Sequence, residues 1–328
     1  MICFPVTESS QVGAIRRQAT HLAQNAGFDP TGVGDVGLIA TEFATNLVKH
    51  ATRGHLFMRV FDVDGGNGLE LLSLDHGPGM AEAARCLNDG YSTPGNPGTG
   101  LGAIRRIASQ FDIHSQEGHG TVAVARIFTE GASGTTVSVG VVHQALPGES
   151  MCGDAWLVQS YDGGLLCVVV DGLGHGPLAA TAAREILDSL AKPLSTKNTV
   201  HLIELAHYAA KATVGAALGV AMLDYDAQVV RFAGVGNISA AVLQGGGRQH
   251  LISYDGVVGK AYRKAQEFTI PWSNESVLVM HSDGIGTRWH AEQYSGLLRR
   301  DPSLLAGMLY RDFARAYDDA TIVVLAAP

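Results

Sequence analysis

The chain has 328 residues, of which 46% are hydrophobic and 16% are charged, and its formal net charge is −8. This length and apolar content suffice for two globular domains with their own cores, which excludes a disordered chain. The 23 lysine and arginine residues are scattered rather than clustered, so no nucleic-acid-binding surface is expected. Proteins and small molecules are the expected partners.

Cysteine usage and the lack of a long apolar run favour a cytoplasmic protein. The four cysteines show no Cys-x-x-Cys spacing and are too few for a disulfide framework, which is typical of a reducing compartment. No basic segment followed by an apolar one opens the sequence, and no uncharged apolar run approaches the ~18 residues of a membrane helix. We therefore expect neither a signal segment nor a membrane partner.

Helical spacing of apolar residues predicts two helices, over about residues 10–26 and 35–50. Glu42 and Asn46 lie off the apolar stripe of the second helix, four residues apart. They therefore share one helix face and are able to serve one ligand together. The alternative is an ordinary solvated helix surface, which shows the same pattern.

Two strand-like runs, 55–63 and 69–74, form a predicted hairpin that delivers Asp75 to its end. Gly77 and Gly79 follow it. A carboxylate followed by two glycines is able to accept a hydrogen bond from a base while the backbone passes close by. A plain loop is the alternative reading.

The segment 91–100 is rich in glycine, proline, serine and threonine, and a helical pattern resumes at 101–108. A glycine-rich loop that feeds a helix N-terminus is suited to bind an anion, although flexible loops have the same composition. Two further strand-like runs follow, at 111–115 and 121–128.

Taken in order, these motifs resemble the GHKL (Bergerat) ATP-binding fold, and within it the RsbT-like anti-sigma-factor Ser/Thr kinases. The resemblance covers residues 1 to about 130 and implies an α/β sandwich domain at 1–132. A histidine kinase is disfavoured, because some 34 residues precede the second helix, too few for a two-helix dimerisation domain. The motifs are Glu42/Asn46, Asp75-x-Gly77-x-Gly79 and Gly98-Thr99-Gly100-Leu101-Gly102.

The resemblance implies that this domain binds ATP with Mg²⁺. Glu42 would be the base that activates a substrate hydroxyl, and Asn46 would hold the Mg²⁺. Asp75 would read the adenine amino group, with Thr121 near the same ring. The loop from Gly98 to Gly102 would wrap the phosphates.

A small, polar segment at 130–136 marks the predicted domain boundary, with a second domain at 136–328. Strand-like runs and two helices, at 177–190 and 200–212, follow it and end in a strand-like run at 322–325. This order predicts an α+β layout in which helices cover sheets.

Acidic residues in this half stand at the ends of apolar runs. The central example is Asp171-Gly172, where the missing Cβ lets a backbone carbonyl approach a cation. One such corner is most often an ordinary turn, but several brought together suit hard divalent cations, which prefer oxygen ligands. The others are Asp154, Asp283, Asp318 and Asp319.

These motifs resemble the PPM/SpoIIE family of metal-dependent Ser/Thr phosphatases, closest to the RsbX-like members. The resemblance covers about 136–328 and implies an αββα sandwich. The motifs are Cys152-Gly153-Asp154, Val170-Asp171-Gly172-Leu173-Gly174, Gly236-Asn237, His281-Ser282-Asp283-Gly284 and Asp318-Asp319-x-Thr321.

By that resemblance two Mn²⁺ or Mg²⁺ ions would hold a water that attacks a phosphoserine or phosphothreonine in line. Asp154 would bridge the ions, and Asp171 with the Gly172 carbonyl would complete one site. Asp283 and Asp318 would complete the other, with Asp318 preferred over its neighbour Asp319 because the family places its ligand first. His175 and His281 are expected to pack or to hydrogen bond behind the ligands, and a third metal stays open.

The sequence thus predicts a bifunctional protein Ser/Thr kinase and phosphatase acting on STAS-domain regulators, either anti-sigma-factor antagonists or stressosome proteins. The alternative is a phosphatase whose N-terminal domain is an ATP-dependent partner-binding switch. A scaffold with two degenerate pockets is a third reading. Kinases of this type often pair, which implies a homodimer, although no sustained heptad supports it.

Overall fold

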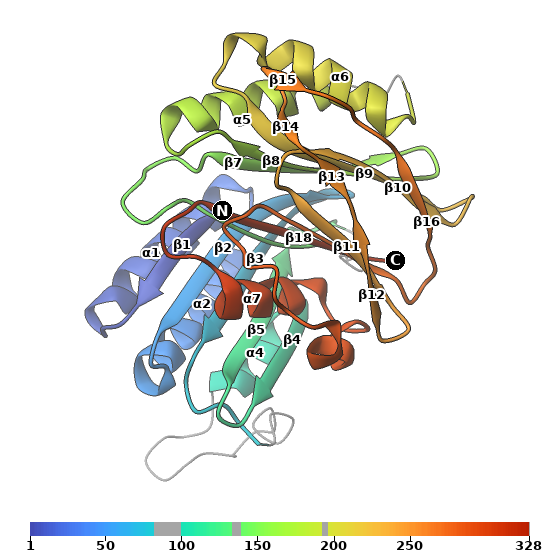
Figure 1. The fold of residues 1–328 in the computed structure, drawn as a ribbon. Coiled ribbons are helices and arrows are strands. Elements are labelled where there is room, and N and C mark those ends of the chain that lie inside the picture. Colours follow the sequence, from blue (N-terminus) through green and yellow to red (C-terminus); the bar gives the residue numbers. More distant parts are fainter. Residues whose placement is uncertain (82–99, 133–138, 192–195, 328) are drawn as a thin grey trace. The chain divides into compact units, whose positions relative to one another are not determined.

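The computed structural model describes residues 1–81, 100–132, 139–191 and 196–327 (Figure 1). It divides into two compact units, Met1–Val137 and Ser138–Pro328, and each is described by itself. Within the described residues, no helix is both long and apolar enough to cross a membrane.

The first unit is a five-stranded antiparallel sheet in the order β1-β2-β3-β5-β4. Helices α1 (Ser10–Asn25), α2 (Pro30–His50) and α4 (Gly100–Ile107) pack one face of it around a shared apolar core. Alternate residues of the strands supply the sheet side of that core, as the two-residue strand period requires. The strands are β1 (Ile2–Val6), β2 (Gly54–Val63), β3 (Gly66–Asp75), β4 (Gln110–Gln116) and β5 (Gly120–Phe128).

The structure extends two of the elements expected in this unit and adds one. Helix α2 begins at Pro30 rather than near residue 35, because the Asp29 side chain accepts a hydrogen bond from the Gly32 amide at 2.9 Å and caps the helix. The β2–β3 turn is tighter than expected, since Val63 pairs with Gly66. Strand β1 was not predicted, because its partner lies some 50 residues away in sequence.

The second unit contains two larger sheets. One has the order β13-β10-β9-β8-β7, with β16 paired to β10, and the other has the order β12-β11-β17-β18-β6. The first holds β7 (Asp154–Tyr161), β8 (Gly164–Gly172), β9 (Ala216–Asp224), β10 (Val229–Val235), β13 (Ser253–Tyr254) and β16 (Phe268–Pro271). The second holds β6 (Val139–Gln144), β11 (Ser239–Gln244), β12 (Gly247–Leu251), β17 (Val277–His281) and β18 (Ala320–Ala326).

Helices cover the outer faces of these two sheets, as Figure 1 shows. Helices α5 (Pro177–Leu190) and α6 (Thr199–Ala209) share an apolar core with the β7–β10 sheet, and a second core fills the space between the sheets. Helix α7 (Pro302–Phe313) lies against β6 and β18. The result is the expected αββα sandwich, so the predicted α+β class is confirmed.

Four short elements complete the second unit: η1 (Ala210–Ala212), η2 (Ala291–Leu297) and the paired strands β14 (Gly256–Val257) and β15 (Ala261–Tyr262). Helix α7 was not predicted from the sequence. Its start is nevertheless marked, because the Asp301 side chain accepts a hydrogen bond from the Ser303 amide at 2.9 Å and Pro302 occupies the first turn.

Candidate functional site

Glu42 and Asn46 lie one turn apart on α2, half-buried, and face the start of α4. A Cβ placed on Gly100 would lie 3.2 Å from Glu42 Oε2 and 3.5 Å from Asn46 Oδ1. The first residue of α4 therefore meets both side chains, and a glycine there leaves them room. Backbone amides at a helix N-terminus favour an anion, so a carboxylate, an amide and an anion-binding helix end come together here.

Asp75 is the last residue of β3, and its Oδ1 accepts a hydrogen bond from the Gly77 amide at 2.6 Å. Side chains are excluded at both following glycines: a Cβ on Gly77 would lie 2.5 Å from the His50 carbonyl oxygen, and one on Gly79 would lie 2.0 Å from that of Gln116. Gly79 also has a φ of +67°, which favours glycine. The two glycines are thus required by close backbone packing around the carboxylate.

Thr121, at the start of β5, lies beside the segment that follows Asp75. Its hydroxyl is 2.9 Å from Ser115 Oγ, and Ser115 Oγ accepts a hydrogen bond from the Met80 amide at 2.8 Å. Sequence reasoning missed Ser115, which links β4, β5 and this segment. No motif marked it.

Only part of the predicted glycine loop is placed. Gly98 and Thr99 lie outside the described residues. Gly100, Leu101 and Gly102 form the first turn of α4, where Gly102 is buried against the unit's core side. The structure thus brings Glu42, Asn46 and the α4 start together.

The acidic residues of the second unit gather at one end of its two sheets. Asp154 and Asp171 stand directly opposite each other on β7 and β8. Asp283 follows β17, and the side chains of Asp171 and Asp318 each lie within hydrogen-bonding reach of it. Four segments far apart in sequence thus meet at one place.

Burial and mutual repulsion raise the pKa values of Asp154, Asp171 and Asp318. The pKa of Asp171 rises to about 9, first through burial and then through the charges of Asp154, Asp283 and Asp318. Burial raises the pKa of Asp154 to about 7, and burial with Asp283 raises that of Asp318. A divalent cation would reverse this repulsion, and oxygen ligands suit Mg²⁺ or Mn²⁺.

The gathered carboxylates are not arranged as a closed set of metal ligands. Among the residues that the structure describes, no three histidine, cysteine, aspartate or glutamate side chains form a ready metal cage. The donor set nevertheless fits a hard cation, because it is all oxygen and strongly acidic.

Hydroxyl groups orient Asp154 from behind. Ser282 Oγ donates to Asp154 Oδ2 at 2.6 Å and accepts from the Thr321 amide at 3.0 Å. Hydrogen bonds from Ser282 and Thr321 act against burial and lower the Asp154 pKa. Asn237 orients Asp283 in the same way, because its Nδ2 donates a hydrogen bond to Asp283 Oδ2 at 2.8 Å.

The adjacent acids Asp318 and Asp319 have different environments. Asp319 is buried, and its two carboxylate oxygens accept hydrogen bonds from backbone amides, one from Leu146 at 2.7 Å and one from Gly153 at 2.9 Å. Asp318 is half-buried and faces Asp283. The geometry therefore favours Asp318 as a ligand and gives Asp319 the role of tying two loops together.

Gly172 is required for a reason that the sequence did not reveal. A Cβ on it would lie 2.3 Å from the carbonyl oxygen of Ala179, so the backbone of α5 packs directly against the end of β8. Gly284 is similarly enclosed, with the Asp319 carbonyl oxygen 1.8 Å from its Cβ position. Both glycines hold the acidic strand ends close together.

The two nearby histidines lie behind or beside the acids. His281 is buried, its Nδ1 donates to the Ser282 carbonyl oxygen at 2.8 Å, and burial lowers its pKa to about 4, so it is neutral. His175 is exposed and its Nδ1 lies 2.7 Å from Glu149 Oε1. Both fit supporting rather than ligating positions.

Family comparisons divide the chain in the same way as the two sites. Residues 4–127 match the histidine kinase-like ATPase domain, and residues 161–328, about half of the chain, match the stage II sporulation protein E (SpoIIE) family. Serine/threonine-protein kinase RsbT of Bacillus subtilis (strain 168) is 27% identical over 119 residues, 36% of this chain and 90% of the relative. Phosphoserine phosphatase RsbX of the same organism is 26% identical over 139 residues, 42% of this chain and 69% of the relative.

Solved structures agree with this division. One solved structure comes from work on the bacterial stressosome, which is described as a modular system adapted to control secondary-messenger signalling. It is 28% identical to this chain, and the match covers 57% of this chain and 97% of the solved chain, with a TM-score of 0.54. RsbX in complex with magnesium is 22% identical, covers 57% and 94%, and gives a TM-score of 0.50, which shows a shared fold. The chain belongs to the SpoIIE family and is a kinase–phosphatase fusion, with a histidine kinase-like ATPase domain ahead of its SpoIIE domain.

Proposed function

We propose that this chain adds a phosphate to, and removes one from, serine or threonine residues of STAS-domain regulators in a stress-signalling partner switch. The observation that carries the proposal is the gathering of Asp154, Asp171, Asp283 and Asp318 from four strand ends, in a chain whose other unit holds the Glu42/Asn46 pair. Each reaction thus has its own set of side chains.

In the proposed kinase unit, Glu42 accepts the proton of the substrate hydroxyl as it attacks the γ-phosphate. Asn46, one turn along α2, presents its side-chain oxygen to the Mg²⁺ that accompanies ATP. Asp75 accepts a hydrogen bond from the adenine amino group, and the amides at the start of α4 face the phosphates. The 3.2 Å approach of the Gly100 Cβ position to Glu42 supports this arrangement.

In the proposed phosphatase unit, Asp154, Asp171, the Gly172 carbonyl, Asp283 and Asp318 hold two Mn²⁺ or Mg²⁺ ions. Bound divalent ions supply an activated water and neutralise charge on the phosphoryl group. Hydrogen bonds from Ser282 and Thr321 favour the ionised form of Asp154, and Asn237 orients Asp283. Asp319 is left outside the ligand set, because its oxygens bind backbone amides.

The substrate class comes from the relatives. RsbT is named a serine/threonine-protein kinase, RsbX a phosphoserine phosphatase, and a structural relative comes from the stressosome. We extend these to STAS-domain anti-sigma-factor antagonists or stressosome proteins as the partners of this chain. Pairing of the kinase units as a homodimer is a separate prediction, which light scattering would check.

The test is phosphotransfer from γ-labelled ATP to a panel of STAS-domain proteins from the same genome, using Asp171→Asn so that the phosphatase does not erase the product. We expect label on one STAS protein. Its loss in the Asp171→Asn, Glu42→Ala double variant would assign the transfer to this chain.

A different outcome would support the alternative function. ATP binding without label, together with ATP-dependent capture of a STAS protein, would make the first unit a binding switch. The phosphatase would then be the chain's one enzymatic activity, and Glu42→Ala would leave capture largely unchanged.

A further inference from the structure

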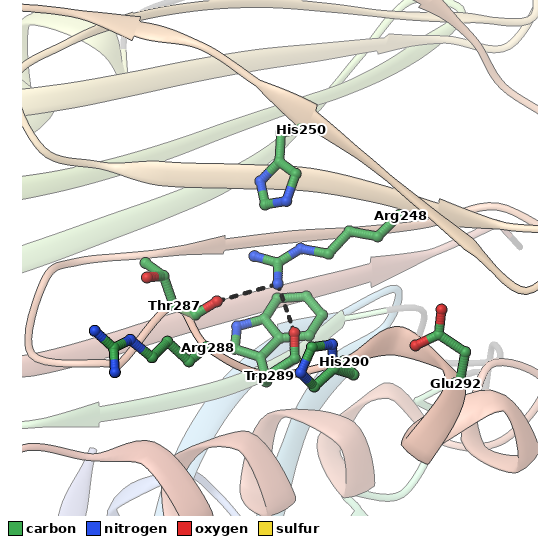
Figure 2. A pocket seen from close by; sticks show the side chains of 7 residues that line it. All are labelled: Arg248, His250, Thr287, Arg288, Trp289, His290 and Glu292. Atoms are coloured by element: carbon green, nitrogen blue, oxygen red, sulfur yellow. Dashed lines mark hydrogen bonds between the residues drawn. The ribbon is translucent and has the colours of Figure 1, made fainter.

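A second candidate site lies in the SpoIIE unit, on edge strand β12 and the segment that follows Asp283. The site is a pocket of about 540 Å³. Figure 2 shows the side chains that line it. It carries two arginines, two histidines and one carboxylate, in a chain whose net charge is −8. The lining residues are Arg248, His250, Thr287, Arg288, Trp289, His290 and Glu292.

Arg248 is held in place within this pocket. Its guanidinium carbon lies 3.4 Å from the ring centroid of buried Trp289, and its Nη1 donates to the carbonyl oxygens of Thr287 and Trp289 at 3.3 and 2.8 Å (Figure 2). A guanidinium that is stacked on a ring and held by two hydrogen bonds loses little further conformational freedom when it binds an anion. It is therefore preorganised.

The pocket's positive charge is available for a ligand. Among the described residues, neither Arg248 nor Arg288 forms an ion pair. The two hydrogen bonds of the Arg248 guanidinium use Nη1, and its Nε is buried, so Nη2 is the nitrogen left for a ligand. Arg288 is exposed at the pocket rim. The planar guanidinium of exposed Arg288 matches the geometry of a carboxylate.

The pocket also lies near the carboxylate cluster. Thr287 is four residues beyond Asp283, so the two Cα atoms are at most about 14 Å apart even along a fully extended chain. A standard protein interface buries about 800 Å² on each partner, a patch wider than that distance. The β12–β11–β17 pairing places Arg248 level with Val277, six residues before Asp283, so the pocket lies along the strand from the carboxylate cluster. A protein whose phosphorylated residue reached Asp283 is large enough to contact the pocket as well.

We propose that the pocket around Arg248, Arg288 and Trp289 binds a glutamate or aspartate side chain of the phosphoprotein substrate, at a distance from the phosphorylated residue. This rests on the proposed phosphatase function. Arg248 anchors the carboxylate, and Arg288 at the rim adds attraction and speeds encounter. The pocket thus selects acidic substrates while the metal-binding acids cleave the phosphate ester.

The test uses two phosphoserine peptides that differ in charge. In each, six glycine and serine residues, with a root-mean-square span of about 14 Å, separate the phosphoserine from four glutamates or from four glutamines. We expect wild-type kcat/KM to be about tenfold higher for the glutamate peptide. The ratio should fall to about one in Arg288→Glu and in Arg248→Gln, and stay near ten in Arg184→Gln, which removes an exposed arginine from α5.

A binding measurement keeps the test decisive if no phosphatase activity is found. Fluorescence anisotropy of the same peptides without phosphate reports the pocket alone, so an inactive wild-type chain that still prefers glutamate peptide would refute the phosphatase and keep the pocket. Equal binding and turnover of both peptides by wild type would overturn the pocket proposal. So would a glutamate preference that survives in Arg288→Glu.

Discussion

The candidate phosphatase site takes its acids from four separated strand ends, whereas the candidate ATP site takes its acid and amide from one helix. In the first, β7–β8 pairing sets Asp154 opposite Asp171, the Ser282 hydroxyl holds Asp154, and the Asn237 amide holds Asp283. In the second, the i, i+4 spacing of Glu42 and Asn46 fixes their shared face, and a glycine at the start of α4 makes room for them. The geometry of the strand-end site therefore depends on the folding of the whole sandwich. The geometry of the helix site depends mainly on how the start of α4 packs against α2.

The largest effect is expected at the helix site. Glu42→Gln should lower phosphotransfer about 10²- to 10⁴-fold, because the amide has no basic oxygen to accept the substrate proton. ATP affinity, measured by calorimetry, should change little. Glu8→Gln, an exposed exchange outside the site, is the matched control. Undiminished transfer would remove Glu42 from the mechanism.

Asp171→Asn should lower manganese-dependent phosphatase activity by at least about 100-fold, because it replaces a charged ligand between Asp154 and Asp283. Initial rates over a manganese titration measure this. Asp188→Asn, an exposed change on α5, should leave the rates unaltered. Full activity in Asp171→Asn would refute the metal-site assignment.

The neighbouring acids Asp318 and Asp319 sharpen the comparison. Asp318→Asn should weaken manganese affinity about 10- to 100-fold with little change in stability. Asp319→Asn should lower the free energy of unfolding by about 1–3 kcal/mol. The carboxylate accepts hydrogen bonds from two backbone amides, and the NH₂ group of the new asparagine would face one of them, donor against donor. The three tryptophans, Trp156, Trp272 and Trp289, all lie in the second unit, so their fluorescence follows its unfolding. The reverse pattern would exchange the two roles.

The smallest effect is a pH dependence of the metal-free second unit. Asp154 and Asp171 have pKa values of about 7 and about 9 in the folded chain, against an ordinary 3.8, whereas buried His143 and His281 have pKa values of about 4, against an ordinary 6.5. The histidines offset the acids below about pH 6.5, so the native state binds more protons than the unfolded state chiefly between about pH 6.5 and 9. Stability with a chelator should therefore fall as pH rises through this window. Tryptophan fluorescence melts measure it, and manganese should remove the slope. A melting temperature that rises with pH would contradict the described electrostatics.

The sequence predicted the α+β class, most helices and the acids that the structure gathers, because apolar periodicity and Asp-Gly corners are local signals. The roles of those acids remain predictions. The preference for Asp318 over Asp319 came from the family resemblance alone. The sequence did not reveal the amides that hydrogen bond to Asp319, because Leu146 and Gly153 are far away in the chain. Ser115 was missed because no motif marks it and the Met80 amide that donates to it is 35 residues away. The stacking of Arg248 on Trp289 likewise joins residues far apart in the chain.

The most direct test of two opposed activities in one chain mixes two complementary variants. Asp171→Asn, which keeps the kinase set, would first label a STAS-domain protein from γ-labelled ATP, and Glu42→Ala, which keeps the phosphatase set, would then be added with manganese. We predict that the label appears with the first variant and is removed as free phosphate by the second. Label that never appears, or that persists after Glu42→Ala is added, would contradict the account.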